Sequence, residues 1–227
     1  MTPPPPSERI RLVTSVLEAN DRIAARTREA CTAAGVLLVD VLGGPGAGKT
    51  ALLEATLPRL GARAAVIAGD LETSRDAERL AACGVPVVQI TTNSFGGACH
   101  LDAGMVAQAL DQVPLTAIDV LFVENVGNLV CPAEFDIGQH ARVVVLSVAE
   151  GEDKPLKYPL AFRRADAAVV AKIDLLPHLE FDLARLRESL HAVHPSLPCF
   201  ELSVRSGAGL EAWLLWIAAQ RRHRPTP

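Results

Sequence analysis

A glycine-rich segment, GGPGAGKT, occupies residues 43–50 and specifies a chemistry more sharply than any other part of this chain. It fits the pattern G-x-x-x-x-G-K-[ST], and it stands directly after a short apolar run and directly before a helical pattern, as a phosphate-binding loop requires. Glycines let successive backbone N–H groups curl around a polyphosphate, and the N-terminus of the following helix adds its dipole. The segment therefore predicts a nucleotide site.

Each residue of this loop has an expected part in that site. Lys49 is placed to reach the β- and γ-phosphates, as a binding and catalytic residue, and the Thr50 hydroxyl is placed to bind Mg²⁺. The remaining expected contacts of the nucleotide in this segment are Gly44, Gly46, Ala47, Gly48 and Ala51.

A phosphate-binding loop also needs a carboxylate on the metal side, at the end of a neighbouring strand. Asp70 follows the apolar run 65–68, and Glu124 follows the run 118–123. The sequence Glu124-Asn-Val-Gly has the outline of the D-x-x-G switch of GTPases, with Glu in the first place. We expect Asp70 near Mg²⁺ or the attacking water and Glu124 near Mg²⁺ through water, both as catalytic residues. The alternative for either carboxylate is a helix cap or a surface acid.

Two short segments indicate which base is bound. Lys172-Ile-Asp174 follows the run 167–170 and resembles the N-K-x-D guanine motif, with Ala171 in place of its asparagine. The Asp174 carboxylate can accept hydrogen bonds from N1–H and the exocyclic amine of guanine, which adenine does not offer. Lys172 can pack its stem along the base. The absence of the asparagine predicts a less firmly braced loop.

The second of these segments comes after the last apolar run. Ser203, Val204 and Arg205 resemble the S-A-K loop, whose backbone approaches the guanine carbonyl. Because the two segments occur in the correct order, each after a predicted strand, they favour guanine over adenine.

Cysteine and histidine form a second constellation at Cys99, His100 and Cys131. Two thiolates and an imidazole suit Ni²⁺, Zn²⁺ or Cu⁺. Three ligands do not complete a tetrahedral shell, which suggests sharing across a two-fold axis. Cys131 lies seven residues after Glu124, inside the expected nucleotide-sensing segment, so nucleotide state could move a metal ligand. Spacing alone leaves ordinary buried cysteines as the alternative, and Cys31, Cys83 and Cys199 are expected to be core residues.

Apolar runs that scarcely alternate, separated by helical patterns, predict a parallel sheet covered on both faces. The fold expected is α/β, a three-layer P-loop NTPase fold with a mostly parallel sheet of about seven strands. The predicted strands are 36–42, 65–68, 87–90, 118–123, 142–148, 167–170 and 199–202, and helical patterns cover 8–34 and 49–60.

The chain has 227 residues, of which 49% are hydrophobic and 21% charged, enough for one large domain. We expect a proline-rich tail (1–7) and helix in 1–34, a P-loop domain in 35–220 and a charged tail in 221–227.

A net charge of −4 gives no field for holding nucleic acid. The apolar stretch 80–99 is broken by glycine and proline, so no membrane association is expected. Five irregularly spaced cysteines and no apolar N-terminal segment indicate the cytoplasm.

With these motifs in order, the chain resembles the HypB family of hydrogenase nickel-insertion GTPases, within the signal-recognition and MinD-like (SIMIBI) class. The segments that carry the resemblance are 43–50, 69–70, 75–79, 99–103, 124–132, 151–159, 172–175 and 203–207. The resemblance implies a GTPase that converts GTP to GDP, uses Mg²⁺, and delivers nickel during maturation of nickel–iron hydrogenase.

The resemblance also implies a ligand set and partners. Cys99, His100 and Cys131 would bind nickel or zinc at the interface of a GTP-stabilised homodimer. The partners implied are the small nickel chaperone HypA and, through it, the hydrogenase large subunit.

Two alternatives belong to the same P-loop group. A urease-type maturation GTPase carries Cys-Pro-His at its metal site, whereas no proline separates Cys99 from His100 here. A small-molecule kinase needs an arginine-rich lid, and the only interior arginine pair is Arg163-Arg164. The physiological metal, nickel or zinc, and the nickel enzyme served stay open at this point.

Overall fold

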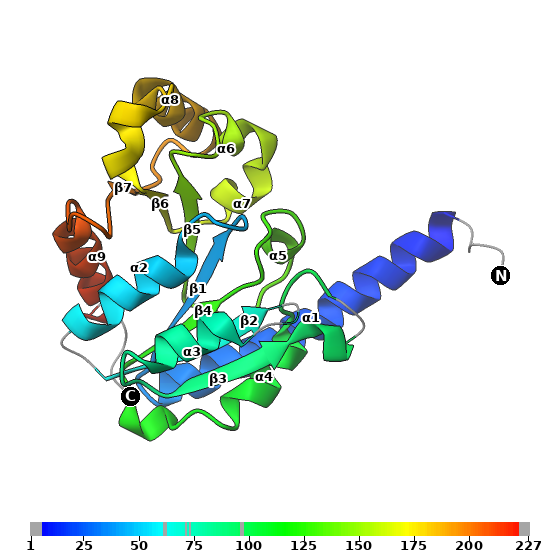
Figure 1. Cartoon of the computed structure of the whole chain (residues 1–227). Helices are drawn as coiled ribbons and strands as arrows, with labels where there is room; N and C mark the ends of the chain where they lie inside the picture. Colours follow the sequence, from blue (N-terminus) through cyan, green and yellow to red (C-terminus); the bar gives the residue numbers. More distant parts are fainter. Residues whose placement is uncertain (1–5, 61–62, 71, 73, 96–97, 223–227) are drawn as a thin grey trace.

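The structure is a computed structural model and describes residues 6–60, 63–70, 72, 74–95 and 98–222. Its centre is a seven-stranded sheet in the order β3-β2-β4-β1-β5-β6-β7, in which every pairing is parallel (Figure 1). The strands are β1 (Leu37–Gly43), β2 (Ala64–Asp70), β3 (Val87–Thr91), β4 (Val120–Glu124), β5 (Ala141–Ser147), β6 (Ala167–Ala171) and β7 (Cys199–Glu201).

Helices connect the strands and cover both faces of the sheet. The α-helices are α1 (Pro6–Ala33), α2 (Lys49–Thr56), α3 (Arg75–Ala81), α4 (Ala103–Leu110), α5 (Cys131–Glu134), α6 (Lys154–Lys157), α7 (Pro159–Arg163), α8 (Leu183–Val193) and α9 (Leu210–Arg222). Short 3₁₀ helices are η1 (Leu57–Arg59), η2 (Thr92–Phe95), η3 (Leu115–Ala117) and η4 (Ile173–His178). The predicted α/β fold with seven strands is confirmed.

The ends of three helices differ from expectation. The last helix, α9, continues to Arg222, so residues 221 and 222 belong to the helix and not to the tail; residues 223–227 lie outside the described residues. The N-terminal helix begins at Pro6, so residues 6 and 7 belong to the helix and not to the tail; residues 1–5 lie outside the described residues. Proline is tolerated in a first helical turn because its missing N–H has no partner there. The helix after the glycine loop ends at Thr56 and continues as η1, because Pro58 cannot donate to the α-helical ladder.

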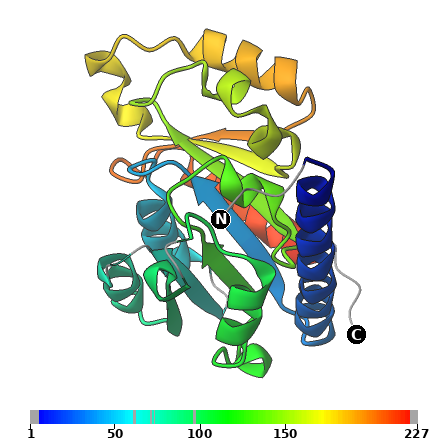
Figure 2. The ribbon, with the colours of Figure 1, turned by 90° about the vertical axis from the view of Figure 1, so that its right-hand side faces the viewer.

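The sheet is buried on both faces because alternate residues of each strand point to opposite sides. On one side, Val39 and Val41 pack in a cluster with residues of α2, α3 and α9, including Trp213. On the other side, Leu38 lies in a cluster with residues of α1 and α4, and Leu42 in a cluster with residues of α5, α7 and α8. Figure 2 shows α1 on the opposite side of the sheet from α2 and α3.

The parallel arrangement determines where functional segments meet. Because all strands run the same way, the segments that follow β1, β2, β4, β6 and β7 emerge at one edge of the sheet, where ligands of such folds bind. These segments carry the residues predicted to hold a nucleotide. Among the described helices, none combines the length and the hydropathy that a bilayer crossing requires.

Candidate nucleotide and metal site

The glycine loop connects β1 to α2 at the carboxyl edge of the sheet. Gly46 and Gly48 have φ angles of 73° and 105°, which glycine adopts at little cost and other residues rarely do. Lys49 is buried, and burial lowers the pKa of its amine. Its Nζ donates to the carbonyls of Gly43 at 3.1 Å and Gly44 at 3.5 Å. The lysine is therefore held over the loop that would surround a phosphate.

Thr50 and Glu124 lie together at the start of α2 and the end of β4. The Thr50 hydroxyl donates to Glu124 Oε1 at 2.7 Å, whereas Glu124 Oε2 is buried and accepts no hydrogen bond from the described residues. Burial raises the pKa of Glu124 to about 7. A buried carboxylate oxygen without a partner, beside a hydroxyl, suits a divalent cation bound by oxygen. The residues present thus fit Mg²⁺.

A cavity of about 480 Å³ opens over the glycine loop and includes Lys49, Thr50, Asp70 and Glu124 in its lining. Asp70 ends β2, beside this group. The expected placement of Asp70 near the metal and the attacking water stays a prediction.

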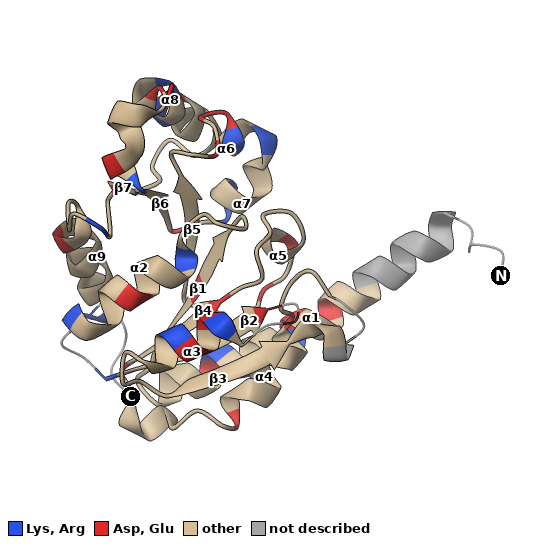
Figure 3. Ribbon diagram, in the orientation of Figure 1, with Lys and Arg blue, Asp and Glu red and all other residues tan. Residues whose placement is uncertain are grey.

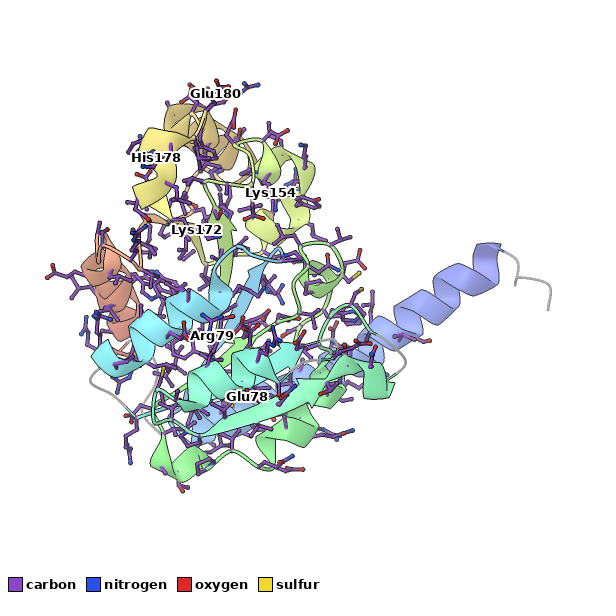
Figure 4. All side chains as sticks on the ribbon, in the orientation of Figure 1. Glu78, Arg79, Lys154, Lys172, His178 and Glu180 are labelled. Atoms are coloured by element: carbon purple, nitrogen blue, oxygen red, sulfur yellow. The ribbon has the colours of Figure 1, made fainter. Side chains whose placement is uncertain are left out.

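The same cavity is lined by two residues of α3 that were not among the predicted site residues, Asp76 and Arg79. Arg79 bridges α3 to α2 through Glu54, at 2.9 and 2.6 Å, and also pairs with Asp76 at 3.2 Å (Figure 4). The Glu54 carboxylate raises the pKa of Arg79. The signal that could have identified these residues is the charged stretch RDAER, close after the strand that ends in Asp70.

Next to the phosphate cavity lies a second cavity of about 280 Å³, lined by the base-site candidates Lys172, Asp174, Val204 and Arg205. Ser203 Oγ donates to Asp174 Oδ1, and the Ile173 N–H donates to the Leu202 carbonyl at 3.3 Å. The two guanine-type segments, 29 residues apart, therefore form one pocket wall. A mostly apolar pocket with one carboxylate suits a purine base.

The loop after β6 is braced without the asparagine that Ala171 replaces. Lys172 Nζ donates to the Gly46 carbonyl at 2.6 Å, which joins this loop to the glycine loop (Figure 4). Lys172 has a φ of 64°, the one positive value of a non-glycine residue in the described parts of the chain. Such backbone strain persists where the surroundings enforce it, commonly at ligand sites. Together with the Ser203–Asp174 bond, these contacts fix the loop.

The metal-ligand candidates meet at the surface. Cys99, His100 and Cys131 offer ligand atoms that all lie within 4.8 Å of one another. The two sulfur atoms are 2.9 Å apart, and Cys99 Sγ lies 4.0 Å from His100 Nδ1. The segment before α4 supplies the first two residues and the first residue of α5 supplies the third. A donor set of two thiols and an imidazole fits Ni²⁺ or Zn²⁺.

The surroundings of His100 favour its neutral imidazole, which is the form that binds a metal. Burial lowers the pKa of His100, and its ring stacks on that of Phe135 at 4.2 Å between centroids. The contact with Cys99 and burial raise the pKa of the Cys131 thiol. A cation that binds here must therefore displace a thiol proton, as is usual for cysteine ligands.

One segment links the metal candidates to the glycine loop. Asn128 forms an isolated antiparallel bridge with Gly43, and its Nδ2 donates to the Cys99 carbonyl at 3.3 Å. It also accepts from the N–H of Val130, immediately before Cys131. The segment from Glu124 to Cys131 therefore contacts the phosphate loop and both parts of the metal site.

The remaining cysteines meet expectation only in part. Cys31 is buried and Cys83 is half-buried, but Cys199 is exposed, so its prediction as a core residue is wrong. The reason is its place in β7, the short strand at the edge of the sheet. Charged residues of both signs lie on α3, and a basic residue lies at the start of α2, beside the nucleotide cavity (Figure 3).

Comparison with known proteins agrees with this geometry. The profile of the CobW/HypB/UreG nucleotide-binding domain matches residues 38–201. The hydrogenase maturation factor HypB of Azotobacter vinelandii is 47% identical over 220 residues, covering 96% of this chain and 72% of the relative. HypB of Escherichia coli K12 is 46% identical over 208 residues, covering 91% and 71%. The chain belongs to the HypB family.

A solved HypB structure extends the likeness to three dimensions. HypB from Helicobacter pylori, solved in complex with nickel, superposes with a TM-score of 0.85 at 37% identity and covers 92% of this chain and 99% of that one. The match to the CobW/HypB/UreG nucleotide-binding domain, over residues 38–201, includes the glycine loop, the three metal-ligand candidates and Asp174. Membership therefore identifies this chain as a P-loop nucleotide-binding protein of a nucleotide-hydrolysing family.

Proposed function

We propose that this chain is a GTP-hydrolysing metallochaperone that delivers nickel during maturation of nickel–iron hydrogenase. The observation that carries the proposal is the segment 124–131, which begins at the expected magnesium position and ends at a candidate metal ligand. The hydrogenase maturation role of its HypB relatives and the nickel complex of the Helicobacter pylori protein support it.

In this proposal the nucleotide site selects GTP and positions it for hydrolysis. The Asp174 carboxylate accepts from guanine, and Lys49 binds the β- and γ-phosphates. Thr50 and Glu124 hold Mg²⁺, which neutralises charge on the phosphates when bound. Asp70 orients the attacking water. The loss of γ-phosphate frees Glu124 and the residues that follow it to change position.

The cargo site would use Cys99, His100 and Cys131 for Ni²⁺, with Zn²⁺ as the competitor that the same ligands accept. Three ligands leave a coordination position open, which a second copy of the chain could fill in a GTP-stabilised homodimer. The proposed acceptors are the nickel chaperone HypA and, through it, the hydrogenase large subunit. The proposal places the protein in the cytoplasm, where thiols stay reduced.

The first test titrates nickel while recording particle mass, with GDP and with a non-hydrolysable GTP analogue. We expect nickel affinity to differ between the two nucleotide states and mass to double in one of them. Cys131→Ala should remove the dependence of nickel affinity on the nucleotide, because it deletes the candidate ligand at the end of segment 124–131. Cys199→Ala, a substitution of an exposed cysteine outside the site, is the matched control. Nickel affinity and mass that ignore the nucleotide would refute the coupling.

A second measurement separates a GTPase from a kinase. Phosphate release is followed with GTP and with ATP, in the presence and absence of candidate phosphoryl acceptors. Release from GTP without an acceptor supports the proposal, whereas acceptor-dependent loss of the γ-phosphate supports a kinase. Nickel content of hydrogenase and of urease in cells lacking the protein then distinguishes the two maturation roles.

A further inference from the structure

A buried charge lies in the central strand of the sheet. Asp40, in the middle of β1, has 0% of its surface exposed and lies on the same strand face as Leu38 and Leu42, two residues of apolar clusters. Arg142 of β5 stands opposite in register and is 2% exposed. Its Nε donates to Asp40 Oδ2 at 3.0 Å. Burial of such a pair costs desolvation free energy, and an apolar pair could fill the same space.

The arginine of this pair holds the end of α5. Arg142 Nη2 donates to the Phe135 carbonyl at 2.6 Å, and Nη1 lies 3.5 Å from the Ala133 carbonyl. Cys131 is the first residue of this four-residue helix, and the Phe135 ring stacks on His100. Arg164 also contacts this helix end, since its Nη1 donates to the Ala133 and Glu134 carbonyls at 3.0 Å. Arg142 is the residue that joins the Phe135 backbone, and with it the ring that supports His100, to the central strand. We call the segment 131–135 the Cys131 arm.

The other oxygen of Asp40 supports the opposite part of the metal site. Asn125 Nδ2 donates to Asp40 Oδ1 at 3.2 Å, and Asn125 Oδ1 accepts from the Leu101 N–H at 3.1 Å. Leu101 immediately follows His100, and Asn125 immediately follows Glu124. We call the segment 98–101 the His100 arm. The Asp40 carboxylate thus joins both arms. It reaches the His100 arm through Asn125, which immediately follows Glu124, the expected magnesium ligand.

We propose that Asp40 is the positioning residue of the metal site, holding the His100 arm through Asn125 and the Cys131 arm through Arg142. Because Asn125 is bonded to Asp40, a displacement of Glu124 on nucleotide exchange moves both arms relative to each other and changes the affinity for the metal. This inference rests on the proposed function for its coupling step. An apolar pair at positions 40 and 142 would fill the same space, but it could not form the directed hydrogen bonds through which these residues hold the two arms.

The test compares two variants with a matched control. Asp40→Val combined with Arg142→Met removes both charges and the oxygens that accept from Asn125 and Arg142, with little change in total volume, a change that buried ion pairs commonly tolerate. Arg142→Lys keeps a cation beside Asp40 but lacks the guanidinium fork that reaches the α5 carbonyls. Thr56→Val is the control, since it removes the buried Trp213–Thr56 hydrogen bond on the other face of the sheet.

Nickel affinity is measured by chelator competition with GDP and with the GTP analogue. We expect the double variant to bind nickel about 10- to 100-fold more weakly, the range typical for outer-shell partners of a metal. The ratio of affinities in the two nucleotide states should fall to about one, and Thr56→Val should keep both values. An unchanged affinity and ratio would overturn the proposal. An equal loss in both states with the ratio kept would overturn the coupling step, because Asp40 would then position the ligands without transmitting the nucleotide state.

A measurement without metal or nucleotide separates this proposal from the proposed function. Hydrogen exchange of the Leu101 amide and reaction of Cys131 with a thiol reagent report the two arms in the free protein. We expect both to quicken about tenfold in the double variant, and only Cys131 to quicken in Arg142→Lys. If the natural protein shows no nucleotide dependence of nickel binding, the coupling fails, and these rates still decide the positioning role. Unchanged rates overturn it.

Discussion

The residue that most directly determines cation chemistry in this chain is Glu124. One oxygen of its carboxylate accepts from Thr50 and the other is buried without a partner among the described residues. The protonated form suits this environment in the metal-free protein, which is why the pKa lies near 7. Bound Mg²⁺ needs the ionised form instead.

Magnesium affinity should therefore depend on pH through Glu124. Below about pH 7, a proton must leave before Mg²⁺ binds, so we expect affinity to rise about tenfold per pH unit up to that value and to level off above it. Titration of Mg²⁺ into the GDP complex at pH 6, 7 and 8 measures this. Glu124→Gln should bind weakly without the pH dependence, and the exposed Glu180→Gln should match the natural protein. The same pH slope in Glu124→Gln would contradict the assignment.

The free energy of unfolding of the metal-free protein should change with pH in the opposite direction to the magnesium affinity. The pKa of Glu124 is raised from 4.5 to about 7 in the fold, so between these values the unfolded chain has released a proton that the folded chain keeps. The contribution of this group to the free energy of unfolding therefore falls as pH rises through that window. Magnesium with nucleotide should offset the loss.

At the scale of elements, α9 anchors the helix that follows the glycine loop. Trp213 of α9 is fully buried, stacks on Trp216 at 5.5 Å between centroids, and donates to Thr56 of α2 at 2.9 Å. The last helix of the chain thus holds the end of α2, whose first residues form the phosphate site. Packing of an aromatic side chain dominates this contact.

Truncation of this anchor should unfold the protein more easily. We expect Trp213→Ala to lower the free energy of unfolding by about 3–5 kcal/mol, because it leaves a large cavity and removes the hydrogen bond that Thr56 accepts. Leu215→Ala is the control, since Leu215 is 61% exposed, and should change stability by less than about 0.5 kcal/mol. Urea denaturation monitored by circular dichroism gives both values. Coincident transitions for the two variants would argue against the packing described.

At the scale of the whole molecule, α1 connects parts of the chain that are distant in sequence. Asn20 is 7% exposed; its Oδ1 accepts from the Ala103 N–H at 2.9 Å and its Nδ2 donates to the Asp136 carbonyl at 2.7 Å. Arg28 of the same helix pairs with Asp136 at 2.5 Å. The N-terminal helix thus ties the start of α4 to the residues after α5, on either side of the metal site.

Removal of the Asn20 amide should loosen this connection. Asn20→Ala leaves the Ala103 N–H and the Asp136 carbonyl without their partner, and we expect a loss of about 1–3 kcal/mol in the free energy of unfolding. Glu18→Ala, an exposed change two residues away on α1, should be neutral. Denaturant titration of both variants decides the matter, and a neutral Asn20→Ala would mean that the two Asn20 hydrogen bonds do not hold α1 in place.

Much of this protein follows from short sequence patterns. The glycine loop, the apolar runs and the guanine-type segments predicted the parallel sheet and the residues at its carboxyl edge, because hydrophobic periodicity and backbone-phosphate chemistry are local properties. The family resemblance rests on the same segments. Cys99, His100 and Cys131 were candidates from residue type, and their side-by-side placement is a property of the fold.

The interactions between residues far apart in the chain are evident only from the tertiary structure. Asp40 and Arg142 stand inside apolar strands, and their charges were the visible signal, but no local rule pairs residues 102 positions apart. Strand order brings them into register, and only then can one carboxylate hold both arms of the metal site. The exposed Cys199 has the same cause, because an apolar run does not reveal that its strand lies at the edge of the sheet.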